Sequence, residues 1–510
     1  MGEYKTPGVY IKEKNAFGNS VVEAETAIPV FIGLTEKTQN GNESLLNKPV
    51  RITSMTEYYK YFGGAKTHKF DVSIVTKEEA NKDDNKEAKQ VKCGENTLQA
   101  KLQENETVCT LYYHMTMFFA NGGSTCYVVS MGDYNTGTID GKIISDTILP
   151  ELKKVQDITM LLVPETADKD NAIGIYQSLL GFCESKKYFA ILDIPTIYQE
   201  GVEGDTDVEK FRNAIGTINL QCAAAYYPWL DTSVLSDNDI NGEVLIWASI
   251  PDLKSLGDKE EKLKPFFEEC MKKITDKKDG DKDLDENGVN KVRNELHNAL
   301  YQNLPVYKQL ADKVKASLNR LPPSAAMAGI YTMVDRTRGV WKAPANVSVN
   351  YVNKPVEVIT DYDQQDLNMP TNGKAINAIR TFPGEGIKVW GARTLDGNSN
   401  DWRYINVRRT MTFLEQSVKN AARAYVFEPN DASTWINMKC MIENFLRSVW
   451  KRGGLAGASP EDAYEVHIGL GDTMTAEDIL EGIMRITVLV AISHPAEFIE
   501  ITFQQQMQKS

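Results

Sequence analysis

Apolar segments alternate with amphipathic segments between residues 150 and 255, and this alternation constrains the fold more than any other feature of the sequence. The predicted strands are Ile158–Val163, Tyr188–Ile194, Cys222–Tyr227 and Val244–Ile250, and the predicted helices are Ala172–Ser185 and Val208–Ile218. Strands that are apolar along their whole length are covered on both faces, and strands joined by helices run parallel. We therefore predict an α/β layer with a mainly parallel sheet.

The length indicates a multidomain protein, and its pattern of strands and helices indicates the α/β and α+β classes. The chain has 510 residues, of which 42% are hydrophobic and 25% charged, as in a soluble globular protein. Two segments rich in charged residues, 66–107 and 252–290, interrupt the apolar pattern, and we expect them to be solvated surface insertions. We assign residues 1–20 to an N-terminal arm, 21–375 to an α/β body and 376–510 to a C-terminal domain.

The C-terminal domain has the clearest helical periodicity. One helix is expected in the α/β body, from about Val292 to Leu318. Two helices are expected in the C-terminal domain. The second of these, capped by Ser433 or Thr434, buries one face made of residues spaced by three and four. Those residues are Trp435, Met438, Ile442, Phe445 and Val449. Strands around Val466 and Val488 follow, with a capping box at Thr475 and Asp478 between them.

Both ends of the chain carry short strands that cannot be stable alone, because five or six residues with one apolar face need a sheet edge to join. The N-terminal strand is Val9, Tyr10, Ile11, Lys12 and Glu13. The C-terminal strand is Phe498, Ile499, Glu500, Ile501, Thr502 and Phe503.

The known signatures of catalysis and cofactor binding are missing from the sequence. It contains no GxxxxGKS/T phosphate loop, no GxSxG, no HExxH and no CxxC, and its five histidines are widely separated. A net charge of −13 argues against nucleic-acid binding, which needs a basic surface. We therefore expect no catalytic residues, no cofactor and no metal site.

Two weaker patterns have alternative interpretations. Asp193 ends an apolar strand, as a metal-positioning aspartate would, but without a phosphate loop a turn residue is favoured. Asp283, Asp285, Asn287 and Gly288 resemble the opening of an EF-hand loop, yet Asn294 stands where the bidentate glutamate belongs. A turn in a charged insertion is therefore favoured over a calcium site.

Neither end indicates membrane insertion. The first residues contain no apolar stretch of the kind that a Sec signal needs. The most apolar run, Ile483–Ile492, is too short to cross a bilayer and contains Arg485.

Several ordered segments resemble the contractile tail sheath family of phages and phage-tail-like injection systems. The longest run reads LPPS from Leu321, AGIY from Ala328, DRTRGVWKAPAN from Asp335, GKAIN from Gly373, VWGART from Val389 and WRYINVRR from Trp402. TPGVYIKE and TAIPVFIG near the N-terminus, FFANGGSTCYVV, FEPN from Phe427 and PAEFI from Pro495 extend the resemblance to most of the chain. The two charged insertions match nothing in that family.

The resemblance implies a non-enzymatic, structural subunit that polymerises around an inner tube and contracts to drive the tube through a target envelope. The C-terminal domain would be an inner sheath domain, completed by terminal strands that neighbouring subunits exchange. The partners would be other copies of the chain, the inner tube protein, and baseplate and terminator or cap proteins, with no nucleic acid and no direct membrane insertion. Assembly in the bacterial cytoplasm would precede incorporation into a phage tail or a tail-like particle.

Two other functions stay open at this stage, and so does one contact. A nucleotide-binding α/β enzyme would place its ligand at the carboxyl ends of the strands, and a sheath-related baseplate or cap component would share the fold. The acidic residues Asp472, Glu477 and Asp478 could face a basic tube surface or be a solvated face.

Overall fold

The computed structural model of the protein describes residues 21–80, 88–104, 106–167, 171–185, 187–195, 206–254, 256, 262–280 and 282–501. They form two compact units, each described by itself. Residues 27–337 and 343–405 make up the first, which we call the sheet unit. Residues 21–26, 338–342 and 406–501 belong to the second, which we call the C-terminal unit.

A nine-stranded sheet organises the sheet unit. Its strands, in spatial order, are β17 (Val347–Ser348), β20 (Gly386–Val389), β19 (Asn377–Phe382), β11 (Ala223–Tyr227), β10 (Phe189–Asp193), β9 (Met160–Leu162), β1 (Pro29–Thr35), β8 (Cys126–Asp133) and β4 (Pro49–Ile52). The six strands from β19 to β8 pair in parallel, whereas β4, β20 and β17 pair antiparallel at the two ends. The predicted mainly parallel sheet is confirmed.

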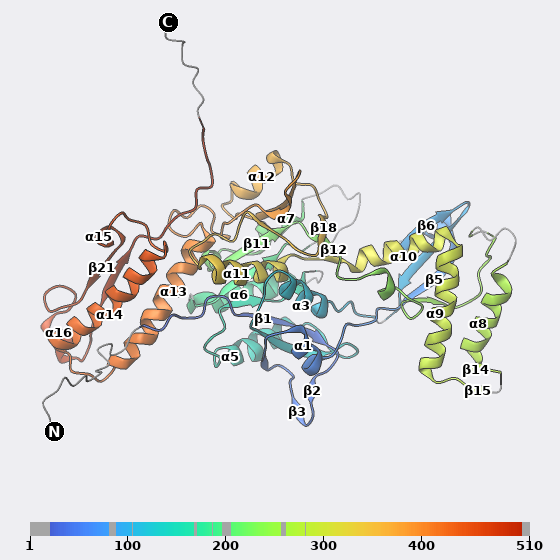
Figure 1. Ribbon diagram of the computed structural model, residues 1–510, viewed down its shortest axis with the longest axis horizontal. Coiled ribbons are helices and arrows are strands. Elements are labelled where there is room, and N and C mark those ends of the chain that lie inside the picture. Colours follow the sequence, from blue (N-terminus) through green and yellow to red (C-terminus); the bar gives the residue numbers. More distant parts are fainter. Residues whose placement is uncertain are drawn as a thin grey trace, which may run out of the picture. The chain divides into compact units, whose positions relative to one another are not determined.

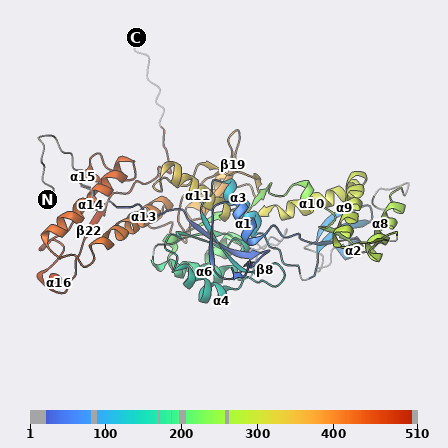
Figure 2. The ribbon, with the colours of Figure 1, turned by 60° about the horizontal axis from the view of Figure 1, so that its bottom comes forward.

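Helices cover both faces of this sheet, because successive side chains of a strand point to opposite faces. On β1, Phe31 belongs to one apolar core, with α3 (Leu111–Ala120) and α11 (Ser324–Arg338). Val30 and Ile32 belong to the other core, with α6 (Ala172–Phe182) and α7 (Asp207–Ala214). Figure 2 shows α11 and α6 on opposite sides of the strands. The sheet unit is thus a three-layer arrangement.

A second, smaller sheet lies in a part of the sheet unit that we call the insertion lobe (Figure 1). Its strands, in order, are β13 (Leu245–Trp247), β5 (Phe70–Thr76), β7 (Asn96–Leu102) and β6 (Lys89–Cys93). The helices of the lobe are α8 (Lys264–Asp276), α9 (Glu286–Asn303) and α10 (Pro305–Leu318). Strands β5, β7 and β6 form an antiparallel meander, and β13 joins β5 in parallel.

The lobe corrects the expectation that both charged segments are merely solvated. Val72 and Leu98 of the first segment are buried in one core with Phe267 of the second. The strand predicted at Val244–Ile250 is also shorter and lies in the lobe, not in the large sheet. Each segment is apolar on only one face, so its composition as a whole is polar. The other segment, which covers that face, lies more than a hundred residues away in the sequence, and the local composition therefore does not reveal the burial.

The long helix predicted from Val292 to Leu318 is two helices in the structure. Leu304 adopts an extended conformation, with φ −118° and ψ 99°, between α9 and α10. Pro305 is the first residue of α10, a position where the missing N–H costs no hydrogen bond. The periodicity is continuous across this break, which is why the pattern alone predicted one helix.

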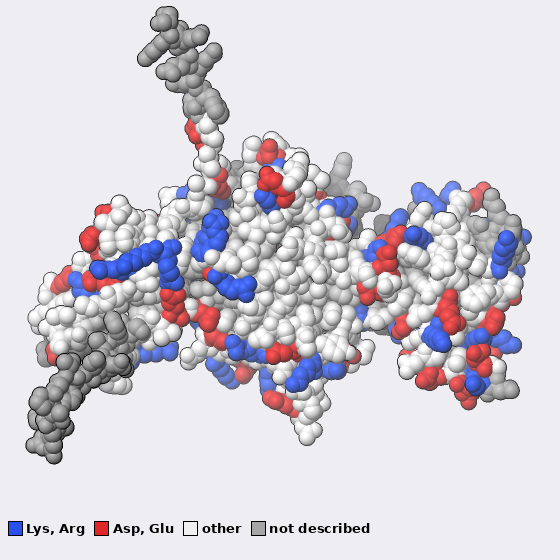
Figure 3. All heavy atoms as spheres, in the orientation of Figure 1, with Lys and Arg blue, Asp and Glu red and all other residues white. Residues whose placement is uncertain are grey.

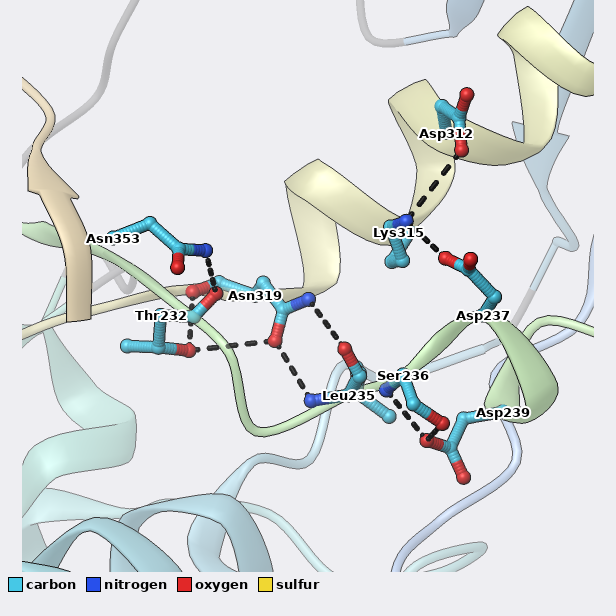
Figure 4. A network of polar contacts seen from close by, with 9 residues as sticks. All are labelled: Thr232, Leu235, Ser236, Asp237, Asp239, Asp312, Lys315, Asn319 and Asn353. Carbon is cyan, nitrogen blue, oxygen red and sulfur yellow. Dashed lines mark hydrogen bonds and ion pairs between the residues drawn. The ribbon is translucent and has the colours of Figure 1, made fainter. Parts of the chain in front are cut away.

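A buried asparagine joins α10 to the strands next to the large sheet (Figure 4). The Asn319 side chain accepts a hydrogen bond from Leu235 N at 2.9 Å and donates one to Leu235 O at 3.0 Å. Thr232, in β12 (Leu230–Thr232), donates from Oγ1 to Asn319 O at 2.7 Å. Lys315, one turn earlier in α10, pairs with Asp237. These contacts attach the lobe to the body.

The domain boundary differs from the predicted one at residue 375/376. Strand β19 pairs with β11 through Tyr226 and Asn377, and β20 pairs with β19, so both strands complete the large sheet. The C-terminal unit therefore begins at residue 406. Strand β11, with which β19 pairs, lies about 150 residues earlier in the sequence, and a local sequence pattern cannot predict such a pairing.

Short elements complete the sheet unit: β2 (Gln39–Asn40), β3 (Glu43–Ser44), α1 (Met55–Phe62), α2 (Lys77–Ala80), α4 (Gly141–Ile143), α5 (Leu149–Leu152), β14 (Lys278–Asp279), β15 (Lys282–Asp283), β16 (Arg320–Leu321), β18 (Val352–Pro355) and α12 (Asp361–Asn368). On the face of the lobe drawn in Figure 3, basic and acidic side chains are interspersed. None of the helices in the described ranges combines the length and apolar character that crossing a bilayer requires.

Candidate functional site

The C-terminal unit is built on the two predicted helices, which pack through their apolar faces. They are α13 (Ile405–Ala422) and α14 (Ala432–Lys451), and Leu414 of the first shares a core with Ile442 and Val449 of the second. The predicted caps of α14, Ser433 and Thr434, are wrong. Asp431 caps the helix instead, and its carboxylate accepts a hydrogen bond from Thr434 N at 3.0 Å.

A two-stranded sheet packs beside α14. Strands β21 (Tyr464–His467) and β22 (Thr487–Val490) pair antiparallel, with Tyr464 opposite Val490. Tyr464 and Val466 are buried, while Glu465 between them is exposed, as the alternation predicted. Among the described residues this sheet has two strands only. Each of its strands therefore has an outer edge that offers backbone groups to a further strand.

The N-terminal chain enters this unit along the two helices. Ala24 N donates to Ser417 Oγ of α13 at 2.9 Å, and Arg409 donates to Thr26 O at 3.0 Å. Glu23 forms an ion pair with Arg452, just after α14. The strand predicted at Val9–Glu13 lies outside the described residues, and the chain that precedes Val21 starts from this anchored segment.

The C-terminal chain leaves the same unit after β22. Asn406 Nδ2 donates to Ser493 O at 3.1 Å, and residues 493–501 form no strand within the chain. Phe498, Ile499 and Ile501 are between 70% and 79% exposed. Three large apolar side chains without cover in one short segment are unusual for a free surface. Thr502 and Phe503, the rest of the predicted strand, lie outside the described residues.

The three acidic residues predicted to contact a tube differ in what they already bind. The Asp478 carboxylate accepts from Thr475 N at 3.0 Å in a capping box and pairs with Arg485 at 3.0 Å. These hydrogen bonds from the Thr475 backbone and from Arg485 lower the pKa of Asp478 to about 2. Glu477, in the first turn of α16 (Ala476–Leu480), is exposed. The capping box is thus confirmed.

His467 lies between two carboxylates on the surface of the same unit. Its Nε2 is 3.1 Å from Glu465 Oε2, and its Nδ1 is 3.4 Å from Asp472 Oδ2. The hydrogen bond to Glu465, and then Asp472, raise the pKa of His467 above its ordinary value. In its protonated form the imidazolium ring connects β21 to the turn at Asp472.

The carboxyl end of the large sheet is where an α/β enzyme would hold a nucleotide. Strands β1 and β9 are neighbours whose following connections diverge, which makes the usual binding crevice. Glu165 of η3 (Pro164–Thr166) fills this place. Its carboxylate accepts from Leu34 N at 2.7 Å and, at the start of α3, from Thr110 N at 2.5 Å and Leu111 N at 2.9 Å.

Glu165 therefore supplies the negative charge that a phosphate would bring to the α3 N-terminus. A side chain on Gly33 would also collide with it, because a Cβ there would lie 2.2 Å from Glu165 Oε2. Sequence reasoning missed Glu165. Its only local indication is a glutamate directly after an apolar strand, and its partners come from distant segments.

Asp193 has a similar role one strand away. It is buried at the end of β10, and its Oδ1 accepts from Ser324 N, the first residue of α11, at 2.8 Å. Burial raises the pKa of Asp193 to about 7. The interpretation as a residue that closes a buried strand is favoured, with the added role of holding a helix N-terminus.

The segment that resembles an EF-hand is not in a loop conformation. Helix α9 begins at Glu286, in the middle of the supposed loop, and Asp285 caps it by accepting from Gly288 N at 2.8 Å. Asn287 and Gly288 are helical. Among the described residues, no group of three His, Cys, Asp or Glu side chains could hold a metal ion.

Comparison with known proteins shows similarity to tail sheath proteins. The family model "Phage tail sheath C-terminal domain" matches residues 398–506. The tail sheath protein of Vibrio phage KVP40 is 25% identical over 149 residues, which are 29% of this chain and 22% of that protein. A putative prophage major tail sheath protein of Pseudomonas aeruginosa is 27% identical over 113 residues, 22% of this chain and 28% of that protein. These matches thus span less than a third of either relative.

Solved structures resemble the chain over almost its whole length. The sheath of the extracellular contractile injection system PVC, in its contracted state, is 28% identical with a TM-score of 0.60, covering 99% of both chains. The contracted helical sheath of the anti-feeding prophage is 26% identical with a TM-score of 0.60, covering 99% of this chain and 100% of that one. The resemblance to contractile sheath proteins and the predicted multidomain fold are confirmed.

Proposed function

We propose that this protein is the structural subunit of a contractile sheath, which polymerises around an inner tube and contracts to drive that tube through a target envelope. One observation supports the proposal most directly. The C-terminal unit combines a sheet of two strands with an exposed, apolar and unpaired C-terminal segment at residues 498–501. The similarity to contracted sheaths over 99% of the chain supports it further.

In this proposal, subunits exchange terminal strands. The strand Val9–Glu13 of one copy and the strand Phe498–Phe503 of another add to the open edges of β21 and β22. Backbone hydrogen bonds provide the attachment, and alternate side chains such as Ile499 and Ile501 are buried in the process. The exposure of these side chains in the single chain is then the surface that assembly covers.

The proposed contraction needs no fuel molecule. Each subunit interface would have two packings that differ modestly in free energy, and many repeats would add these differences. Accordingly, we propose no enzymatic activity and no cofactor. Support comes from the carboxyl edge of the large sheet, where a nucleotide would bind. There the carboxylates of Glu165 and Asp193 accept hydrogen bonds from the N–H groups at the starts of α3 and α11.

The proposed partners are other copies of the chain, an inner tube protein, and baseplate and cap proteins. Of the acidic residues, Asp472 and Glu477 are the exposed candidates for a contact with a basic tube. Asp478 already binds Thr475 and Arg485, so reversing its charge would disturb α16 itself. We place assembly in the bacterial cytoplasm, followed by incorporation into a tail-like particle.

Electron microscopy of the purified full chain, alone and with its cognate tube protein, tests the proposal. Long hollow polymers that surround tubes are the expected result. A stable monomer that ignores tubes would contradict it. A sheath-related baseplate component is the second candidate, because the chain also resembles a chain in the structure of the anti-feeding prophage baseplate, at 27% identity and a TM-score of 0.59. A single ring at one tube end would favour that candidate.

A further inference from the structure

The connection between α13 and α14 presents an aromatic side chain in an unusual way. Phe427 has a φ of +73°, in the left-handed region that bulky residues rarely adopt. Its ring is fully exposed to solvent. Within the described chain, the strained backbone gains no burial of the ring in return. Such outliers persist where the surrounding structure enforces them, and they concentrate at sites of function.

Side-chain hydrogen bonds hold this connection in place. Asn430 Nδ2 donates to Ile483 O at 3.1 Å, which ties the connection to the chain just after α16. Trp435 Nε1 donates to Asn430 Oδ1 at 2.7 Å, and Asp431 caps α14. Glu428 N donates to Tyr425 O at 3.2 Å and closes the turn around Phe427. The exposed ring thus stands on an ordered support, which lowers the entropic cost of binding.

Other exposed apolar side chains come from the same end of the C-terminal unit. They are Val426 in the connection, Ile436 in the first turns of α14 and Leu480 of α16, which is 88% exposed. Figures 1 and 2 both show α16 beside the start of α14. We call Val426, Phe427, Ile436 and Leu480 the tip patch. Leu480 follows Glu477 by three residues, so the patch continues the helix face that carries a candidate tube contact.

Acidic side chains outnumber basic ones in the two stretches of sequence that supply the tip patch. The exposed bases there are Arg423 and Arg485, and Arg485 is paired with Asp478. The exposed carboxylates are Glu428, Asp431, Glu477 and Glu481. The whole chain carries a net charge of −13. An apolar patch with acidic neighbours in the sequence matches a basic partner, and a second copy of this acidic chain matches it less well.

We propose that Phe427 anchors the tip patch in an apolar recess of the inner tube protein, with lysine or arginine side chains around the recess. This contact rests on the proposed sheath function and extends it. The acidic side chains would steer the subunit to the tube, and the ring would supply most of the affinity. A central aromatic anchor surrounded by weaker polar contacts is the usual distribution of energy in an interface.

The test replaces the ring without straining the backbone. Phe427→Asn suits a left-handed φ, because asparagine tolerates this conformation, so the variant should melt no lower than the parent. The sheet unit offers a matched control in Tyr351, which is also an exposed aromatic residue, at φ +61°. The measurement is binding of the full chain to preformed tubes of the cognate tube protein, by co-sedimentation over a range of concentrations.

We expect Phe427→Asn to weaken tube binding at least ten-fold, Leu480→Ser at least three-fold, and Tyr351→Asn less than two-fold. Tube-free polymers of Phe427→Asn should look normal in the microscope. Unchanged tube binding by Phe427→Asn would overturn the proposal. So would normal tube binding with loss of tube-free polymers, which would identify a second copy as the occupant. If the unaltered protein neither polymerises nor binds tubes, the sheath function itself fails, and that result is distinguishable because it requires no substitution.

Discussion

The sheet unit and the C-terminal unit differ in how far their strands are covered by the rest of the chain. In the sheet unit, nine strands lie between two layers of helices, and Glu165 and Asp193 bind the N–H groups at the starts of α3 and α11. Among the described residues of the C-terminal unit, two strands have open edges, and the following segment exposes Phe498, Ile499 and Ile501. One unit is complete within a single chain, and the other has the form of a part that needs neighbours.

This difference suggests a division of labour within one subunit. A body whose sheet is close-packed between two layers of helices can move as a rigid element, because a close-packed interior resists rearrangement. A unit with open edges can be linked to others without rebuilding its core. The four predictions that follow test the contrast between a closed body and an open connector.

The largest expected effect is on assembly. Deleting residues 1–14, or residues 497–510, should abolish polymer formation, because it removes the strands proposed to join the open edges of β21 and β22. Thermal unfolding should change little, since the described part of the second segment is exposed in the single chain. Negative-stain microscopy and calorimetry measure the two outcomes. Normal polymers from either truncation would remove the basis for strand exchange.

The second prediction concerns the closed body. Glu165→Gln leaves two buried N–H groups and one partly buried N–H group with one carbonyl oxygen and should destabilise the sheet unit by about 3 kcal/mol. Hydrogen exchange at Leu34 and Leu111 should accelerate accordingly. Glu209→Gln is the matched control, because Glu209 is also in the first turn of a helix but is exposed in a capping box. That control should cost about 0.5 kcal/mol or less. Equal effects of the two substitutions would contradict the role assigned to Glu165.

The third prediction tests the attachment of the insertion lobe. Asn319→Ala leaves the buried backbone N–H and C=O of Leu235 without their partners and should cost about 2 kcal/mol. The exchange protection of α10 should fall more than that of α6, which lies in the body. Asn353→Ala is the control, because its amide makes one partly exposed hydrogen bond to Thr232 O. A uniform loss of protection in both regions would show that the lobe is not a separate cooperative part.

The smallest expected effect compares histidines in the two units. Burial lowers the pKa of His114 to about 3 and that of His297 to about 4, so both should stay neutral down to about pH 5. Glu465 and Asp472 raise the pKa of His467, so its contribution to stability is complete below about pH 6.5 and is lost as the pH rises through the raised value. Nuclear magnetic resonance titration of the imidazole groups checks this order. A higher pKa for His114 or His297 than for His467 would contradict the burial of the first two and the carboxylate pairing of the third.

The elements that the sequence predicted well are those whose pattern is local. The apolar face of α14 repeats every three or four residues, and β9, β10 and β11 are apolar along their length, so each pattern is complete within its own segment. The capping box of Thr475 and Asp478 likewise needs only four residues. The resemblance to sheath proteins depended on short runs of sequence spread over the chain.

The features that escaped prediction depend on contacts between distant segments. Strand β13 belongs to the insertion lobe because it finds β5, and β19 belongs to the large sheet because it finds β11. Asn319 and Glu165 gain their roles only once Leu235 and Leu34 are beside them. The sequence pattern was enough to propose residues for the candidate interface. It could not show that the Asp478 carboxylate already binds Thr475 and Arg485 within the chain.

The pairing of β5 with β13 has a consequence for the order in which this chain folds. The meander β5–β7–β6 is synthesised by residue 102, whereas the strand and helices that pack with it are complete only at residue 318. At the usual pace of translation this delay is on the order of ten to forty seconds. During that time four strands of the large sheet, β8, β9, β10 and β11, are synthesised between the two halves of the lobe. The lobe can therefore close only long after its first strands are made, and until then its early half has one apolar side uncovered.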